Sequence, residues 1–206
     1  MSRLAFLTLC LTLSMAGQSR MQRNVITLGL GAAVPGQDLK YSFEPSFALG
    51  FNYGFRLHPY LQLDAGLDTA FQSARVNDYI YTGFGAHRIR DYQLFIPFGG
   101  RIIVPAGNRW QLFAGGGGAY VRYYEAISQP SYYYRIDCPP CSSRSGVGYY
   151  GLVGFRWRPN EFSPFWIGAS ARVLRVQTDG QPIGDLIVRP TNDRWITPML
   201  EFGFSF

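Results

Sequence analysis

Two histidines and a pair of cysteines are the residues of this chain that could support catalysis or metal binding. A hydrolytic or acyl-transfer site would combine a histidine with a serine and an acid. His58 precedes Pro59 in a short turn, and His87 lies in a polar segment without a His-x-Ser pattern. We therefore interpret His87 as a solvated loop histidine. We expect no catalytic residue and no cofactor.

Cys138 and Cys141 form a Cys-x-x-Cys pair in another polar segment. A zinc site would need a second cysteine pair or histidine ligands, which the neighbouring sequence lacks. A thioredoxin-type redox site needs a helix after its first cysteine, and no helical pattern follows. We predict a small disulfide at the tip of a loop that forms outside the cytoplasm, and no metal site.

Charged residues recur at alternate positions of several segments, and the positions between them are apolar. Isolated charges in such surroundings are costly, so these side chains are expected to pair. Counted from the nearest short turn or from the chain end, four of them lie at similar heights, and Asp64 and Arg101 fall on adjacent segments. We predict an ion-pair network formed by Asp64, Asp68, Arg101, Arg156, Arg172 and Glu201.

Tyrosine and arginine are interleaved in the polar segments, and both are enriched at binding hot spots. One interpretation is an interaction surface for a host molecule, another protein or lipopolysaccharide phosphates. The other is a sealing layer in which arginine neutralises lipid phosphates non-specifically. The residues concerned are Tyr79, Tyr81, Phe84, Tyr132, Tyr133 and Tyr134 with Arg75, Arg88, Arg90, Arg135 and Arg144.

The elements that carry these residues alternate with a period of two, which is typical of half-buried strands. The clearest example is the last segment, where Leu200, Phe202, Phe204 and Phe206 alternate with smaller or polar residues. Eight strands are expected, at 24–34, 47–57, 61–71, 92–104, 110–123, 147–157, 164–176 and 195–206.

Short and long connections alternate strictly between these strands, so an up-and-down sheet would have all tight turns at one end. The long connections cover roughly 35–45, 72–91, 124–146 and 177–194. Large apolar residues occupy one parity, and small or charged residues occupy the other. A soluble barrel would have the large apolar residues inside. The pattern instead predicts a transmembrane barrel with lipid outside and a charged lumen, with a secreted β-sandwich as the alternative.

The composition of the 206 residues agrees with this prediction. Only 16% are charged, whereas 17% are aromatic and 24 are glycine. Disorder and a helical bundle are excluded by the aromatic content and by the shortage of lysine and glutamate. Beyond the N-terminus no run is long enough for a membrane-spanning helix. The net charge of +6 is scattered along the chain, which disfavours nucleic acid as a partner.

The first residues have the form of a secretory signal peptide. One positive charge at Arg3 precedes an apolar stretch from Leu4 to Met15, and small residues follow. The stretch is too short to span a membrane as a helix. We predict a signal peptide at 1–19 and one barrel domain at 20–206.

The chain end, with Phe202, Phe204 and a terminal Phe206, resembles the C-terminal signal that the outer-membrane assembly machinery reads. With the signal peptide and eight strands, the mature chain resembles the small OmpA/OmpX-type barrels, within the porin-like outer-membrane β-barrel proteins. The resemblance implies an all-β, eight-stranded antiparallel up-and-down barrel in the outer membrane of a Gram-negative-type bacterium. It implies outer-membrane lipids, lipopolysaccharide and the assembly machinery as partners.

A structural or surface-interaction role is the function expected from these features, with the lumen plugged by charged residues. A narrow porin or small-solute channel is the alternative. A lipid A-modifying enzyme is a weaker alternative. Similar barrels with that activity would need a histidine, a serine and an acid near the outer rim, and no His-x-Ser pattern is present. A conduit for hydrophobic solutes would require an apolar lumen.

Overall fold

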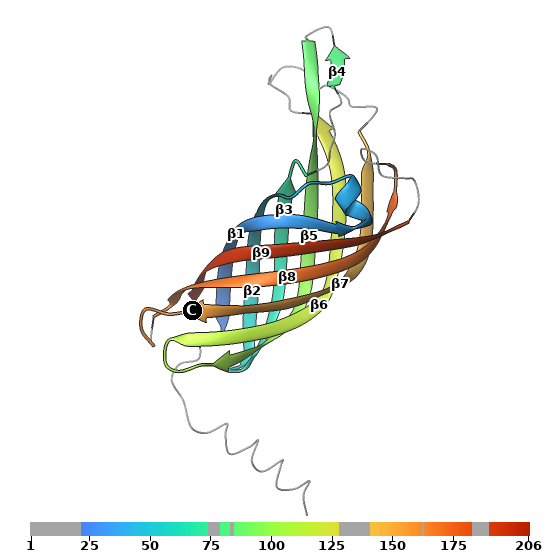
Figure 1. Ribbon diagram of the computed structural model, residues 1–206. Helices are drawn as coiled ribbons and strands as arrows, with labels where there is room; N and C mark the ends of the chain where they lie inside the picture. Colours follow the sequence, from blue (N-terminus) through green and yellow to red (C-terminus); the bar gives the residue numbers. More distant parts are fainter. Residues whose placement is uncertain (1–21, 74–78, 83–84, 128–140, 162, 183–189) are drawn as a thin grey trace, which may run out of the picture.

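The computed structural model describes residues 22–73, 79–82, 85–127, 141–161, 163–182 and 190–206. It is a closed antiparallel barrel of eight strands, which confirms the architecture expected from the sequence (Figure 1). Hydrogen bonding of β1 to β9 and of β3 to β5 closes the sheet. The barrel strands are β1 (Asn24–Gln37), β2 (Ser46–His58), β3 (Leu61–Phe71), β5 (Gly85–Pro105), β6 (Trp110–Ile127), β7 (Ser143–Trp157), β8 (Phe165–Gly180) and β9 (Thr191–Ser205).

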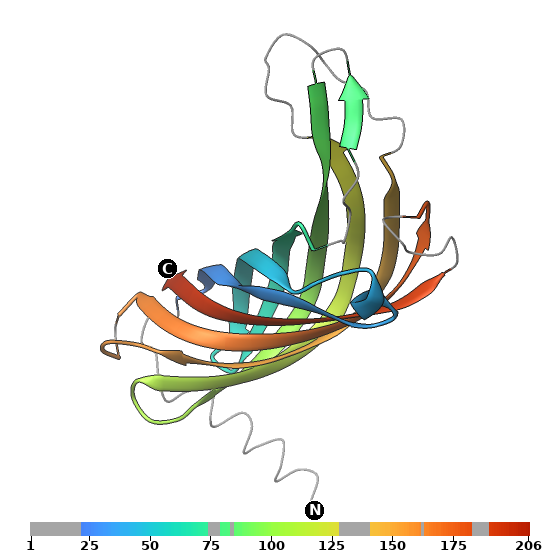
Figure 2. The same ribbon diagram turned by 45° about the horizontal axis from the view of Figure 1, so that its top comes forward.

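The strands on the side of the long connections are longer than the periodicity predicts. β5 begins at Gly85, where the sequence indicates a loop, and the short β4 (Tyr79–Thr82) pairs with its first residues. β6 stays paired with β5 as far as Ile127. Figures 1 and 2 show the outer ends of β5 and β6 rising beyond the other strands, with β4 beside β5. The barrel wall therefore continues past the segment that lipid would cover.

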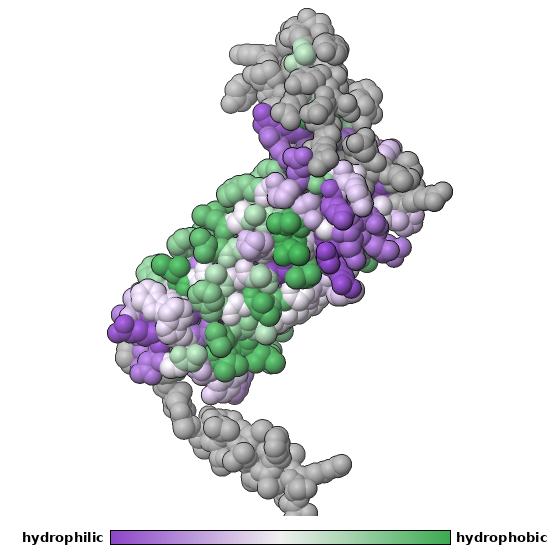
Figure 3. Space-filling view, viewed as in Figure 1, coloured by the Kyte–Doolittle hydropathy of each residue, from purple (hydrophilic) through white to green (hydrophobic). Residues whose placement is uncertain are grey.

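The outward side chains form an apolar belt around the middle of the barrel. On β8 the outward residues from Phe165 to Val173 are all apolar. This span of about nine residues is the length that a tilted strand needs to cross a bilayer. Figure 3 shows the belt in green between two ends where hydrophilic residues gather. No helix among the described residues is long and apolar enough to cross a membrane.

The polarity of the wall inverts beyond the belt, towards the long connections. Val173 and Ile196 are paired neighbours facing outward, and the next outward pair is Arg175 with Arg194. The inward residues change in the opposite sense, from Arg172 to Leu174 on β8. Just beyond the belt, β8 and β9 therefore have apolar residues inside and polar residues outside, as a water-soluble barrel does.

A tryptophan packed over a glycine fixes the contact between β8 and β9 near the short turns. Trp166 is paired directly with Gly203, and both positions face the lumen. A Cβ atom on Gly203 would lie 1.9 Å from the Trp166 ring. The absence of a side chain at Gly203 therefore lets the ring lie flat against β9.

The predicted signal peptide at 1–19 lies outside the described residues and stays a prediction. The first barrel strand begins at Asn24, whose backbone N–H donates to the carbonyl of Phe206 (2.9 Å). The three phenylalanines of the predicted assembly signal face outward. The ring of Phe204 lies between those of Phe165 and Phe206, with centroid separations of 4.9 and 5.8 Å.

Candidate functional site

Asp64 is the centre of a polar cluster in the half of the lumen nearer the short turns. Its carboxylate accepts hydrogen bonds from Arg101 Nε (2.5 Å), Gln62 Nε2 (2.6 Å) and Asn52 Nδ2 (3.0 Å). These donors come from β5, β3 and β2, which are neighbours in the barrel. Both carboxylate oxygens are bonded, one of them to a guanidinium, so the buried charge is compensated.

A second ion pair crosses the lumen. Arg172 on β8 contacts the carboxylate of Asp68 on β3, and both side chains are almost fully buried. Along the wall, β8 and β3 are separated by β9, β1 and β2. The pair therefore links strands that share no backbone hydrogen bonds. The Arg172 guanidinium also lies 5.2 Å from the ring centre of Tyr150 on β7.

Arg156 and Glu201 are placed differently from the single network that the sequence predicts. Glu201 Oε1 accepts a hydrogen bond from Ser170 Oγ (2.5 Å). The Arg156 guanidinium lies 4.4 Å from the ring centre of Trp166 and 4.9 Å from that of Phe113. The structure thus brings four of the six predicted residues into two ion pairs and stacks Arg156 on aromatic rings. Guanidinium groups are well suited to such stacking.

Aromatic side chains fill the other half of the lumen, towards the long connections, and the sequence pattern did not predict this packing. The Trp195 ring lies 5.7 Å from Phe43 and 5.5 Å from Phe95, between ring centres. Trp195 Nε1 donates a hydrogen bond to Tyr123 Oη (2.8 Å), so the buried indole N–H has a partner. We call Phe43, Phe95, Tyr123 and Trp195 the aromatic plug. They come from four different parts of the chain.

The segment between β1 and β2 turns into the lumen instead of standing out as a polar loop. The short 3-10 helix η1 (Asp38–Tyr41) lies at the outer end of these strands (Figure 1). Leu39 and Phe43 are fully buried, whereas Tyr41 is 72% exposed. The spacing of Leu39 and Phe43 by four residues is the sequence signal that could have indicated a buried turn.

Polar side chains close the lumen beyond the aromatic plug. Thr178 Oγ1 donates to Asp193 Oδ2 (2.7 Å), and Arg144 Nη2 donates to the carbonyl of Thr178 (3.2 Å). Arg144 is only 1% exposed. Its assignment to the Tyr/Arg-rich outer surface was wrong, because its parity on β7 directs it inward.

The other loop residues of that prediction divide into two groups. Arg90 is exposed on β5. The remaining ones lie outside the residues whose side chains the structure describes, and so does His87. His58 is the last residue of β2, beside the short turn, where Tyr60 N donates to its Nδ1 (3.4 Å). Cys141 is disulfide-bonded, and its predicted partner Cys138 is outside the described residues. Within the described residues no cluster of His, Cys, Asp or Glu could hold a metal ion.

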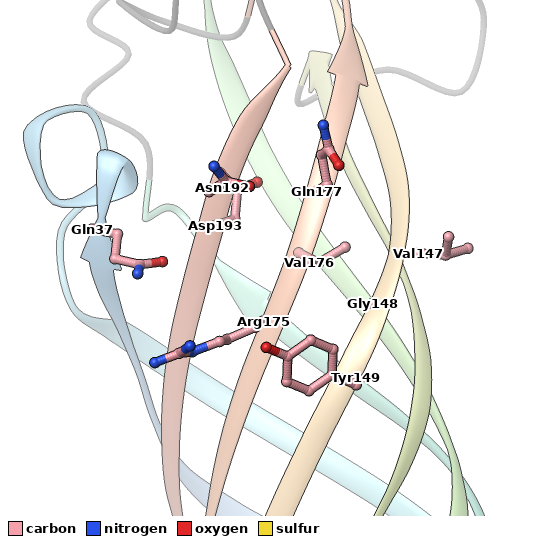
Figure 4. A pocket seen from close by; sticks show the side chains of 9 residues that line it. All are labelled: Gln37, Val147, Gly148, Tyr149, Arg175, Val176, Gln177, Asn192 and Asp193. Atoms are coloured by element: carbon pink, nitrogen blue, oxygen red, sulfur yellow. The ribbon is translucent and has the colours of Figure 1, made fainter.

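A groove on the outward face lies at the height where the wall changes polarity. It has a volume of about 390 Å³. Figure 4 shows Tyr149 and Arg175 on neighbouring strands, with Gln37 and Asn192 nearby. No local sequence pattern indicates this groove, because its residues come from three strands and from the end of β1. It is lined by Gln37, Val147, Gly148, Tyr149, Arg175, Val176, Gln177, Asn192 and Asp193.

Comparison with solved structures gives the same architecture. Neisserial surface protein A has a TM-score of 0.58 at 11% identity, over 89% of this chain and 97% of that one. This chain has the fold of the small outer-membrane β-barrels. Ail of Yersinia pestis, solved with the heparin analogue sucrose octasulfate, has a TM-score of 0.54 at 13% identity, over 89% and 98%. OprG from Pseudomonas aeruginosa has a TM-score of 0.53 at 14% identity, over 89% of this chain and 96% of that one.

In sequence, by contrast, no family model and no curated protein matches the chain. The outer-membrane barrel fold is therefore recognised through its geometry. The outer-membrane location expected from the sequence is that of these structural relatives, and the apolar belt is the surface that such a location requires.

Proposed function

We propose that this outer-membrane barrel has a structural or surface-interaction role, that it is not an enzyme, and that its lumen is closed to solutes. The observation that carries the proposal is the filling of the lumen along its length. Two ion pairs occupy one half, the aromatic plug occupies the other, and a polar layer lies beyond it. A barrel of eight strands is just wide enough to be filled in this way.

The energetics of the filling support a closed state. An ion or polar solute passing through would have to separate Asp68 from Arg172, and uncompensated buried charges cost roughly 3–5 kcal/mol. It would also have to displace Trp195 and Phe43, which pack against each other inside the wall. Neither obstacle depends on a mobile gate, so closure is an intrinsic property of the fold.

Single-channel recording in planar bilayers tests the closed lumen. The unmodified chain is expected to give no conductance steps, and neither is a Glu201→Ala variant, because Glu201 bonds to Ser170 and belongs to neither ion pair. A known open porin, reconstituted in the same way, supplies the positive control. Discrete steps from the unmodified chain would overturn the proposal and favour a narrow channel.

The non-enzymatic part of the proposal rests on the arrangement of the histidines. His58 lies in a turn at the end of the barrel opposite the long connections, and the sequence around His87 lacks a nearby serine in a His-x-Ser pattern. Mass spectrometry of lipid A from cells that express the chain tests this directly. We expect unchanged acyl chains, and a chain gained or lost would contradict the proposal.

The projecting wall of β5 and β6 supports the surface-interaction role. Arg90 and Arg122 face outward on these neighbouring strands. Because Ail was solved with a sulfated sugar, a sulfated polysaccharide is the first ligand to test on this wall. Binding of heparin to the bilayer-embedded chain should fall in an Arg90→Gln/Arg122→Gln variant. Undiminished binding by that variant would exclude this wall as the binding surface.

A further inference from the structure

We propose that Arg175 and Arg194 form a binding site for a phosphate group of an outer-leaflet lipid. The two residues are direct cross-strand partners on the outward face of β8 and β9. Like charges in directly opposite positions destabilise a pair of strands. Among the described residues neither arginine has a carboxylate partner within ion-pair distance. A bound anion would convert this repulsion into a shared attraction.

The height of the arginine pair identifies the source of the anion. The outward neighbours one step towards the membrane are Val173 and Ile196, which belong to the apolar belt. One step in the other direction are Gln177 and Asn192, which are polar. The guanidinium groups therefore lie where the belt ends on the side of the long connections. In an outer-membrane barrel this is the headgroup level of the external leaflet.

The local backbone leaves room for both side chains to reach along the surface. Gly36 is the outward partner of Arg194 on β1, and a Cβ atom there would lie 2.7 Å from Arg194 Nε. The Arg194 guanidinium therefore lies across a glycine. Figure 4 shows the Arg175 side chain directed towards β9, with Tyr149 beside it on β7. Arg175 and Arg194 are thus paired neighbours whose side chains both lie on the outward face of β8 and β9.

The groove described above supplies the neutral donors of the site. Gln37, Gln177 and Asn192 line it together with Tyr149 and Arg175. Amide and hydroxyl groups beside a guanidinium are donors that a phosphate group with several acceptor oxygens can use. Of the two acids nearby, Asp38 accepts a hydrogen bond from the backbone N–H of Asn192 (3.3 Å). Asp193, which also lines the groove, is 1% exposed and accepts from Thr178 Oγ1 (2.7 Å). The acyl chains of the same lipid would lie along the apolar belt directly below.

The inference rests on the outer-membrane location within the proposed function, and it is independent of whether the lumen conducts. The chain is reconstituted in phosphatidylcholine vesicles alone, with lipid A, or with lipid A from which the phosphates have been removed. The temperature at which the folded, heat-modifiable gel band disappears reports stability. Native mass spectrometry reports retained lipid A. The folded band in phosphatidylcholine alone checks insertion separately from lipid binding.

We expect phosphorylated lipid A to raise the unfolding temperature of the unmodified chain more than dephosphorylated lipid A does. An Arg175→Gln/Arg194→Gln variant should lose this difference and retain about tenfold less lipid A, the loss expected for one charge-assisted hydrogen bond. In phosphatidylcholine alone the same variant should be at least as stable as the unmodified chain, because the repulsion is gone. Arg109→Gln is the control, since Arg109 is an exposed arginine in the turn between β5 and β6, at the opposite end of the barrel.

Equal lipid A retention by the double variant and the unmodified chain would overturn the proposal. So would equal stabilisation of the unmodified chain by the two forms of lipid A, a comparison that needs no variant to fold. Stabilisation by inorganic phosphate in phosphatidylcholine vesicles, without any preference for phosphorylated lipid A, would contradict a lipid-borne ligand. A loss of retention in Arg109→Gln as large as in the double variant would contradict a local site.

Discussion

At the scale of single residues, the lumen handles its charges in two different ways. Asp64 and Asp68 each form an ion pair with an arginine, whereas the Arg156 guanidinium stacks on the rings of Trp166 and Phe113. Sequence parity was sufficient to predict that these residues face inward, because the period of a strand is fixed. It could not predict the stacking of Arg156, since that contact depends on rings from two other strands.

Removing one member of the ion pair across the lumen should destabilise the fold more than removing both. Asp68→Asn leaves Arg172 buried without its partner, and we expect a loss of roughly 3–5 kcal/mol in the free energy of unfolding. The Asp68→Asn/Arg172→Gln variant should recover part of that loss. Urea unfolding in detergent micelles, analysed as a double-mutant cycle, measures the coupling. Strictly additive losses would show that the contact contributes nothing.

Gly203→Ala should be destabilising because the new methyl group would overlap the Trp166 ring. The ring is buried beneath Arg156, so it has no free space to move into. Overpacking of this kind costs about 1–3 kcal/mol. The matched control is Gly151→Ala, where a Cβ atom would meet nothing within 4 Å. Equal urea midpoints for the two variants would contradict this packing.

At the scale of elements, the unexpected feature is η1, whose segment supplies part of the core. The sequence from Gln37 to Ser42 is mostly polar, and composition alone favours an exposed loop. Burial of Leu39 and Phe43 depends on a vacancy between Trp195, Tyr123 and Phe95, which only the closed barrel creates. Local patterns therefore predicted the strands β1 and β2 but not where the connection between them goes.

Phe43→Ala should weaken the aromatic plug while leaving the strands intact. Loss of a buried phenylalanine side chain costs roughly 3–5 kcal/mol, and the resulting space exposes the Trp195 ring. We expect a lower urea midpoint and a red shift of tryptophan fluorescence in the folded state. Tyr41→Ala, in the same segment but exposed, is the control and should change neither quantity. A Phe43→Ala variant indistinguishable from this control would contradict insertion of the segment.

At the scale of the whole molecule, the inversion of wall polarity explains what the sequence did and did not predict. Within the belt, large apolar residues face lipid, and this rule assigned the parity of β8 and β9 correctly. Beyond Val173 and Ile196 the surroundings are polar, so the same parity carries Arg175 and Arg194. A single inside–outside polarity along the whole length of each strand therefore does not predict the aromatic plug, and it makes the predicted loops too long.

The orientation of the barrel gives a final prediction, because the two ends of the barrel should face different compartments. Short turns of outer-membrane barrels face the periplasm and long connections face outward. A cysteine introduced at the exposed Gln181 should react with a membrane-impermeant maleimide in intact cells. A cysteine at the exposed Asn160, in the turn between β7 and β8, should react only after the outer membrane is permeabilised. The unmodified chain gives the background labelling, and the reverse pattern would mean that the arginine pair faces the inner leaflet.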